Sequence, residues 1–482
     1  MHTLVARPAK REMAHVLAAS LSANRRERAV WRASLALLGL QLAGMLVFSA
    51  VQYRRYNLTT DFAAYSQAWA AIAHGHFDPY SSVFGMQFWQ NDFELLMWPL
   101  AVFYWVYPHA VTLLWLQDIA VVGTEIVALA WVRDALRKDR NGTSNGAVVL
   151  GMAALLSIIT PWSWFTIGFD FHFVPFATLF ALLAARNLWA GPGRLLMVWV
   201  PLALICCATA GALIIIGIGV AALAGRQHGR ACGFAVVLAG LAWLGLGSGI
   251  SATRFAGIDL GSMYGYLAGG VNRHLTLLGA LEGFVTHPNR AADMFRSHAV
   301  YVAGWVASGG AIGLASRWGV FPAVFVLLPN ALNADPNFIH FAAAFQNWPA
   351  VVFLVVGSAL TLDRIVSKAA SPRRVIAAFG CCTLATAAVI PWFFLRSIPP
   401  YLERVNSGAA EKLATAQQRI PRGAEVVASQ GVVGRFSTGR AAYPYWAVGV
   451  PERYPVSSSK VVFILAPVQG TAEGYPRETY RA

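Results

Sequence analysis

One acidic residue, Asp61, is placed where it could act on a substrate at a membrane surface. It follows a long apolar run directly, in the sequence YNLTTDFAAYSQAWAAIAHGHFDPY. A structural interpretation is available, because Thr60 or Asp61 is a suitable N-cap for a helix with Tyr65 and Trp69 on one face. The functional interpretation is a general base that takes a proton from an acceptor hydroxyl. The residues alone leave both interpretations open.

Two further pairs of polar residues lie in segments that are otherwise rich in aromatic residues. Asp92 and Glu94 open the apolar stretch 93–108, and Asp170 and His172 lie in the short connection WSWFTIGFDFHF. Aromatic neighbours desolvate carboxylates and stack on sugar rings. Each pair is therefore either solvated loop polarity or part of a site.

His340 and four arginines complete the candidates. His340 precedes a late apolar run and is either a structural histidine or a substrate-binding one. The arginines could hold a phosphate group by charge-assisted hydrogen bonds; they are Arg54, Arg55, Arg254 and Arg273. Carboxylate oxygens could also hold a hard divalent cation, Mg²⁺ or Mn²⁺, near that phosphate. The candidate ligands are Asp61, Asp92 and Asp170, and the sequence indicates no other cofactor.

Two acidic residues, Asp118 and Glu125, fall inside a long apolar run. Because they are seven residues apart, they share one face of a helix. Charged groups in a membrane span are costly and often functional, so a transporter or flippase of lipid-linked precursors is one alternative and polar packing inside the bundle is the other. The sequence has no GxxxxGK[ST] loop and no GxGxxG after a strand. This argues against ATP-driven transport and dinucleotide redox chemistry.

The composition indicates what kind of element positions these residues. Hydrophobic types make up 57% of the 482 residues and charged types only 12%, about half the charged share of soluble domains. Apolar runs of about 18 or more residues are therefore expected to span a membrane. The net charge of +15 would suggest nucleic acid in a soluble protein. In a membrane protein it reports which side each loop faces, and no nucleic-acid partner is expected.

Eleven apolar runs are predicted to cross the lipid bilayer. If 93–108 stays in the interface, the loops of one side hold twenty Lys and Arg, and those of the other side hold six before residue 396. The positive-inside rule makes the first side cytoplasmic, with the N-terminus inside and the C-terminus outside. The predicted spans are 31–51, 111–132, 146–161, 173–190, 195–208, 210–225, 231–250, 298–316, 318–334, 349–362 and 375–395.

These spans predict three parts and two long outer loops. Their bounds are 1–30 (basic cytoplasmic segment), 31–396 (transmembrane domain with outer loops 52–110 and 251–297) and 397–482 (extracytoplasmic α/β domain). The spans around Thr209–Gly211 are expected to form a re-entrant pair. In the tail, YLERVNSGAAEKLATAQQRI predicts a helix, and AEVVAS and KVVFILAP predict buried strands.

Several stretches, in a fixed order, carry a resemblance to a known family. They are TDFAAYSQAWAAIAHGHFDPYSS, NDFELLMWPLAVFYWVYPHAVTLLWLQDIAVVGTEIVALAWVR, FDFHFVPFATLFALLAARNLW, YGYLAGGVNRHLTLLGALEGFVTHP, IHFAAAF and IPRGAEVVAS. Over about residues 35 to 465 the chain resembles the bacterial membrane family called domain of unknown function 2079. That family is similar in plan to the GT-C membrane glycosyltransferases.

The resemblance implies an all-α polytopic fold of the GT-C kind, with in-plane helices in the first outer loop, in the bacterial plasma membrane. It implies a glycosyltransferase that moves a sugar from a polyprenyl-phosphate carrier to a glycan, lipid or protein acceptor of the cell envelope. Asp61 occupies the position of the catalytic base in GT-C enzymes. The chain has Asn91-Asp92-Phe93 where the family usually has Asp-His-Phe, so a non-catalytic relative is a third interpretation.

Overall fold

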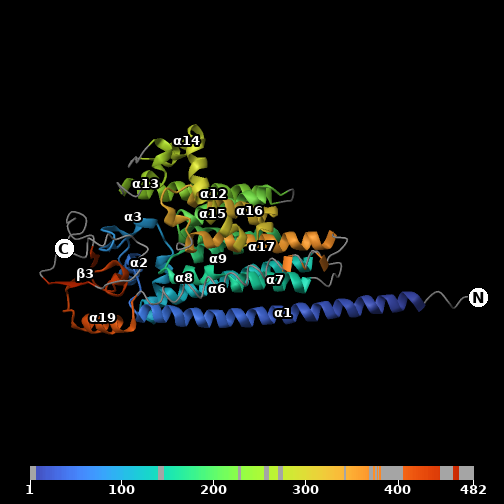
Figure 1. Cartoon of the computed structure of the whole chain (residues 1–482), viewed down its shortest axis with the longest axis horizontal. Coiled ribbons are helices and arrows are strands. Elements are labelled where there is room, and N and C mark those ends of the chain that lie inside the picture. The colour runs from blue at the N-terminus through green and yellow to red at the C-terminus, as the bar shows by residue number, and fades with distance from the viewer. Residues whose placement is uncertain are drawn as a thin grey trace, which may run out of the picture.

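Long apolar helices dominate the computed structural model and run side by side along one direction (Figure 1). The structure describes residues 7–138, 146–225, 229–254, 260–269, 275–340, 344–368, 373–374, 377, 379–380, 405–445 and 460–465. Within these ranges, only the backbone is described at 7–24, 91–92, 251–254, 262, 277, 337 and 368.

Five stretches of described helix are long and apolar enough to cross a membrane, and shorter apolar helices stand beside them. In a bilayer core every backbone N–H and C=O must be paired, and a helix does this within its own segment. All predicted spans up to residue 250 coincide with helices, and the predicted boundary at residue 30 falls inside the first helix. The bounds are α1 (Arg7–Arg54), α6 (Val111–Lys138), α7 (Gly146–Ile159), α8 (Pro161–Gly168), α9 (Val174–Ala190), α10 (Leu196–Cys206), α11 (Ala210–Leu223), α12 (Arg230–Arg254), α16 (Arg317–Ala331) and α17 (Ala344–Lys368).

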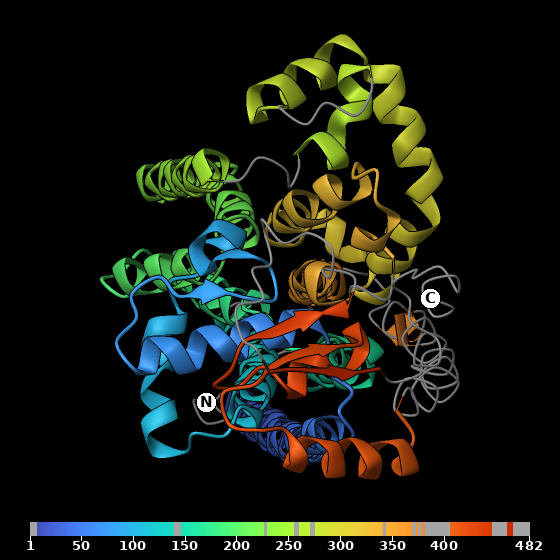
Figure 2. The same cartoon turned by 90° about the vertical axis from the view of Figure 1, so that its left-hand side faces the viewer.

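The predicted span 298–316 is not one uninterrupted helix. Helix α15 (Pro288–Ser308) is seen along its length in Figure 2, where α1 is seen end-on, so α15 lies oblique to the bundle. It ends at Gly309 and Gly310, where a Cβ would meet Leu354 Cβ at 2.5 Å and Ser358 Oγ at 2.6 Å. The helix therefore stops where its backbone must approach α17, and the short helix η2 (Ala311–Ala315) follows. The last predicted span, 375–395, lies almost entirely outside the described residues.

The stretch 93–108 does not cross the bundle, as predicted. It forms two helices too short to span, α4 (Met97–Leu100) and α5 (Val102–Val106). Met97 and Leu100 are buried, whereas the large side chains that follow are exposed: Val102, Phe103, Trp105, Val106 and Tyr107. An exposed row of aromatic and aliphatic side chains is typical of a segment that lies in the bilayer interface.

The remaining elements before α6 complete the first outer loop, and three more helices precede α15. Their bounds are α2 (Thr60–Ala73), β1 (Tyr80–Ser81), β2 (Met86–Gln87), α3 (Phe88–Asp92), α13 (Leu260–Tyr264), η1 (Gly265–Ala268) and α14 (Leu277–Thr286), with η3 (Pro336–Phe338) following α16. Strands β1 and β2 pair antiparallel.

The two short helices predicted around Thr209–Gly211 are confirmed, because α10 ends at Cys206 and α11 begins at Ala210. A Cβ on Gly211 would lie 2.4 Å from the Ala203 carbonyl oxygen, so this turn requires glycine. The Leu96 N–H donates to the Ile205 carbonyl at 2.9 Å, which holds the turn against the first outer loop.

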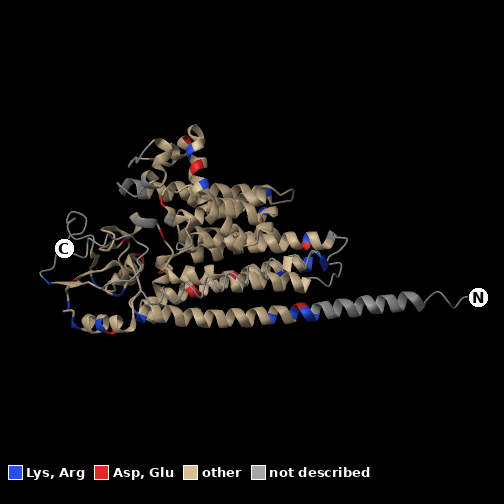
Figure 3. Cartoon of the chain, viewed as in Figure 1, with Lys and Arg blue, Asp and Glu red and all other residues tan. Residues whose placement is uncertain are grey.

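Lys and Arg residues are frequent at the end of the bundle nearer the N-terminus of the chain (Figure 3). Glu27 of α1 pairs with Arg133 at 3.1 Å and with Arg137 at 2.9 Å, and Asp134 pairs with Arg186. These ion pairs join α1, α6 and α9 at one end of the molecule. Which side of a membrane this end faces stays a prediction.

A small parallel sheet forms the tail domain at the opposite end, in the order β4-β3-β5. The predicted helix and the two predicted strands are confirmed. The third strand, β4, was not predicted, because it is only three residues long and ends in proline. The bounds are α19 (Ser407–Arg419), β3 (Glu425–Ala428), η5 (Gln430–Arg435), β4 (Ala442–Pro444) and β5 (Val461–Ile464).

The tail domain shares a hydrophobic core with the first outer loop. Tyr56, Ala63 and Val83 of the loop pack in one cluster with tail residues such as Val426. The Gly434 N–H donates to the Leu58 carbonyl at 3.1 Å. The beginning of α1 and the tail domain lie at opposite ends of the bundle (Figure 1).

Candidate functional site

Asp61 lies in the first turn of α2, at the end of the bundle that carries the tail domain. The N-cap is Thr59, whose own side chain makes no capping hydrogen bond. The prediction that Thr60 or Asp61 caps this helix was therefore wrong by one or two positions. Asp61 is instead a helical residue whose side chain is 31% exposed, and its carboxylate is accessible from solvent.

Asp170 caps α2 from a distant part of the chain. Its carboxylate accepts hydrogen bonds from the Thr59 N–H at 2.9 Å, the Phe62 N–H at 3.4 Å and the Thr59 hydroxyl. Asp170 adopts a left-handed backbone with φ of 53°, a conformation that aspartate tolerates better than most residues. Negative charge at a helix N-terminus is favourable, so Asp170 fixes the helix that carries Asp61.

His172 lies beside Asp61, with Nε2 3.7 Å from Asp61 Oδ2. Its ring stacks on Phe345 with centroids 3.7 Å apart and planes at 3°. Burial lowers the pKa of His172 to about 3, although its hydrogen bond to the backbone of Phe169 acts in the opposite direction. The imidazole is therefore neutral at physiological pH.

Gln117 of α6 holds the connection that carries Asp170 and His172. Its side-chain amide donates to the Asp170 carbonyl at 2.9 Å and accepts from the His172 N–H at 2.5 Å. Neither Gln117 nor Phe345 was predicted to belong to the site. A glutamine inside an apolar run was a usable signal for the first, whereas one phenylalanine among many gave no signal for the second.

Glu94 is buried one layer away from this pair. Its carboxylate accepts a hydrogen bond from the Tyr65 hydroxyl at 3.0 Å, and the Tyr65 ring contacts His172 with centroids 5.9 Å apart. Asp61, Asp170, His172 and Glu94 are therefore brought to one region by α2 and the connection before α9.

The other candidate residues lie elsewhere or outside the described part of the chain. His340 is exposed and packs against Tyr301, with ring centroids 5.0 Å apart. Arg54 is exposed in the last turn of α1 and Arg55 follows it, partly buried. The side chains of Asp92 and Arg254 and all of Arg273 are outside the described residues.

Of the three candidate cation ligands, Asp61 and Asp170 have described side chains and Asp92 does not. Three donor groups already engage the Asp170 carboxylate, mainly through Oδ2, and would compete with a metal for that oxygen. No group of three His, Cys, Asp or Glu side chains among those described could hold a metal ion.

Asp118 and Glu125 are buried between helices and engage polar neighbours there. Asp118 accepts a hydrogen bond from Ser49 at 3.1 Å. Glu125 accepts bonds from Gln41 at 3.3 Å and Ser163 at 2.6 Å. These contacts join α6 to α1 and α8, which favours polar packing over a transport path.

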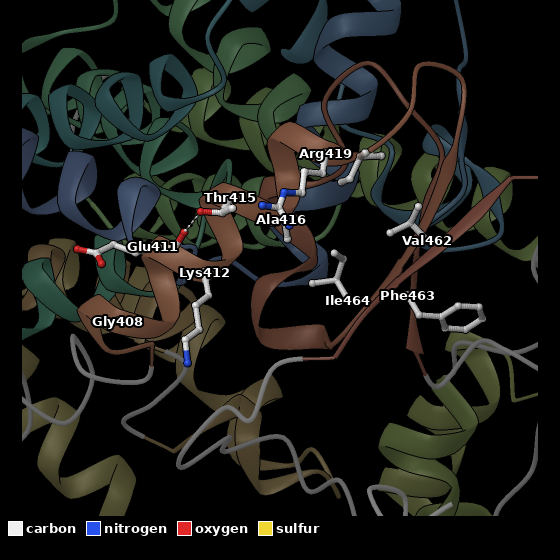
Figure 4. Close-up of a pocket in the computed structure, with 10 residues that line it drawn as sticks. Gly408, Glu411, Lys412, Thr415, Ala416, Arg419, Val462, Phe463 and Ile464 are labelled. Carbon is white, nitrogen blue, oxygen red and sulfur yellow. Dashed lines mark hydrogen bonds between the residues drawn. The ribbon is translucent and has the colours of Figure 1, made fainter.

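A groove of about 690 Å³ lies in the tail domain, between α19 and β5 (Figure 4). Its rim carries Glu411, Lys412 and Arg419, and apolar side chains such as Ile464 line its floor. None of the predicted site residues lines it. The groove is therefore separate from the cluster around Asp61.

Comparison with known proteins gives a family and no assigned activity. No curated protein and no solved structure matches the chain. The family described as "Predicted membrane protein (DUF2079)" matches residues 54–473. The chain therefore belongs to this family of predicted membrane proteins.

Proposed function

We propose that this protein is an integral membrane glycosyltransferase that transfers a sugar from a polyprenyl-phosphate carrier to a cell-envelope acceptor on the outer face. The observation that supports this most is the Asp61–His172 pair, 3.7 Å apart at the end of the bundle opposite the basic end. A partly exposed carboxylate beside a neutral imidazole is suited to general-base chemistry. In this proposal the N-terminus is cytoplasmic and the tail domain is extracytoplasmic.

Asp61 is the general base that removes the proton from the acceptor hydroxyl as the hydroxyl attacks the sugar. His172 offers Nε2 as a hydrogen-bond acceptor that orients the sugar or the hydroxyl, since this atom has no hydrogen-bond partner among the described residues. Asp170 acts indirectly, because it fixes the position of α2. Glu94 also acts indirectly, because it accepts a hydrogen bond from Tyr65. Asp92 and His340 help to position the substrates. The carrier phosphate is bound by four arginines: Arg54, Arg55, Arg254 and Arg273.

The tail domain supplies the acceptor-binding surface in this proposal. Its groove combines charged side chains on the rim with Phe463, which is 55% exposed. Exposed aromatic rings next to polar groups are suited to binding sugar rings. The domain packs on α2 through the Ser66–Ser437 contact of 2.8 Å, so an acceptor bound there lies on the same side as Asp61.

The test is sugar transfer in membranes that contain the protein, with a panel of radiolabelled polyprenyl-phosphate sugars. Asp61→Asn is expected to lower the transfer rate by about 100-fold or more, the usual contribution of a general base. Asp293→Asn is the matched control, because its side chain is 71% exposed on α15, and it should transfer at the wild-type rate.

If Asp61→Asn is expressed normally and transfers sugar at the full rate, Asp61 is not the general base. No transfer by the wild-type protein from any donor of the panel would instead favour the non-catalytic relative. Movement of labelled carrier across the bilayer that is lost in Asp118→Asn and Glu125→Gln would favour the flippase.

A further inference from the structure

Arg435 is held against aromatic rings where the tail domain meets the first outer loop. Its guanidinium carbon lies 3.8 Å from the centre of the Tyr53 ring and 4.8 Å from that of Tyr56. The Arg435 carbonyl accepts a hydrogen bond from Gln417 Nε2 at 3.0 Å, and the Tyr56 hydroxyl donates to Gln417 Oε1 at 2.5 Å. Backbone and side chain are thus both fixed in position.

Among the described residues, no carboxylate lies beside Arg435 to balance its charge. Within the part of the chain that the structure describes, no Asp or Glu lies within ion-pair distance of Arg435, and its buried Nε has no hydrogen-bond acceptor. The partly buried Arg133 and Arg186, by contrast, each pair with a carboxylate. The guanidinium also hydrogen-bonds with Tyr53 and Tyr56. A buried guanidinium N–H without an acceptor is costly, so an anion that accepts a hydrogen bond from Nε would be favoured at this site.

The surroundings of Arg435 are those of a bilayer interface. The Tyr53 ring contacts His109, with centroids 4.7 Å apart, and His109 stacks on the exposed Tyr107. Trp105 just before them is 68% exposed. Aromatic side chains of this kind lie at the level of lipid head groups. Burial, and then the charge of Arg435, lower the pKa of His109.

We propose that Arg435 binds the phosphate group of a membrane lipid at this interface. A planar guanidinium presents pairs of N–H donors that match two phosphate oxygens, and stacking on two tyrosine rings holds it in one orientation before the lipid arrives. The phosphate belongs either to a bilayer phospholipid or to a polyprenyl-phosphate carrier, which share this chemistry. The proposal goes beyond sugar transfer and can hold whether or not Asp61 is a base.

The experiment is a titration of the purified full-length protein in neutral detergent. The unfolding temperature is measured at each ligand concentration. The probes are citronellyl phosphate, phosphatidylglycerol, inorganic phosphate and citronellol, which lacks the phosphate. The two phosphate lipids are expected to raise the unfolding temperature through binding to the folded state, and citronellol is not. Arg435→Gln should weaken their apparent affinity about tenfold or more. Arg435→Lys keeps the charge but not the paired donors, so its apparent affinity should lie between those of the wild type and Arg435→Gln.

Arg422→Gln is the matched control, because it removes an exposed arginine of the same domain that does not line the groove; it should bind both lipids as the wild type does. Tighter binding of citronellyl phosphate than of phosphatidylglycerol supports a carrier, and the reverse order supports a bilayer phospholipid. The proposal is overturned if Arg435→Gln lowers the unfolding temperature without ligand yet keeps the full lipid-induced rise, since Arg435 then only fastens the tail domain. It is also overturned if inorganic phosphate alone reproduces the whole effect.

Discussion

Asp170 is expected to stabilise the protein far more than a solvated loop carboxylate could, because it caps α2 across more than a hundred residues of chain. It is 3% exposed, and two backbone N–H groups and one hydroxyl donate to it. The replacement Asp170→Asn keeps one acceptor oxygen and a residue type that tolerates the left-handed backbone. It removes the charge and turns the second oxygen into a donor that faces other donors.

The magnitude follows from those contacts. Loss of an N-cap costs about 0.5–2 kcal/mol, and a buried donor left without its acceptor costs about 1–3 kcal/mol. We therefore expect Asp170→Asn to lower the free energy of unfolding by about 3 kcal/mol and the unfolding temperature by on the order of 5 °C. Thr59→Val removes only the hydroxyl donor and should cost about 1 kcal/mol.

Fluorescence-detected thermal unfolding of the purified variants measures this difference. Asp293→Asn is again the control, since replacing an exposed carboxylate should change the free energy of unfolding by less than about 0.5 kcal/mol. If Asp170→Asn unfolds at the same temperature as Asp293→Asn, the capping argument is refuted and α2 is held by other contacts.

Three further predictions concern the neighbouring groups. Because burial lowers the pKa of His172 from 6.5 to about 3, the unfolded chain binds a proton between these pH values that the folded chain does not. The free energy of unfolding then falls as the pH drops from 6.5 toward 3, and the unfolding temperature of His172→Gln should fall less steeply than that of the wild type. A Cβ at position 434 would meet the backbone of the first outer loop at 2.9 Å, so Gly434→Ala should loosen the tail domain and speed its proteolysis. Gly408→Ala, whose Cβ would lie 3.6 Å from its nearest neighbour, should be cleaved at the wild-type rate. A membrane-impermeant maleimide added to intact cells should label Thr415→Cys and not Arg194→Cys; the opposite result would invert the topology.

The distribution of charge made the helical part of the fold predictable. Arg133 and Arg137 could be placed on the same side as the basic N-terminal segment, because moving them across would place many basic residues outside. They pair with Glu27 of α1. The same argument predicted that 93–108 does not cross the bundle, although that stretch is apolar enough to do so. The break in α15 was not predictable, because it depends on how closely Gly309 approaches α17.

The candidate site was predictable in its residue types and not in its contacts. Asp61, Asp170 and His172 were all selected from aromatic-rich connections. That Asp170 would cap the helix of Asp61 depends on a left-handed backbone at one residue, which periodicity does not reveal. Arg435 was missed for a related reason, because Tyr53 and Arg435 are separated by most of the chain and neither has an unusual sequence context.

Asp61 lies on a helix that two separate sets of contacts hold in place, and this affects what the site can do. Asp170 holds the first turn of α2. Further along the same helix, Ser66 contacts Ser437 and the Gln67 amide donates to the Arg440 carbonyl at 3.1 Å. A carboxylate on a rigid element keeps a fixed relation to its surroundings, and catalytic groups need that precision. The tail domain therefore helps to position Asp61 through α2. In the proposed mechanism, loosening the tail domain should slow sugar transfer without any change in the residues around that carboxylate.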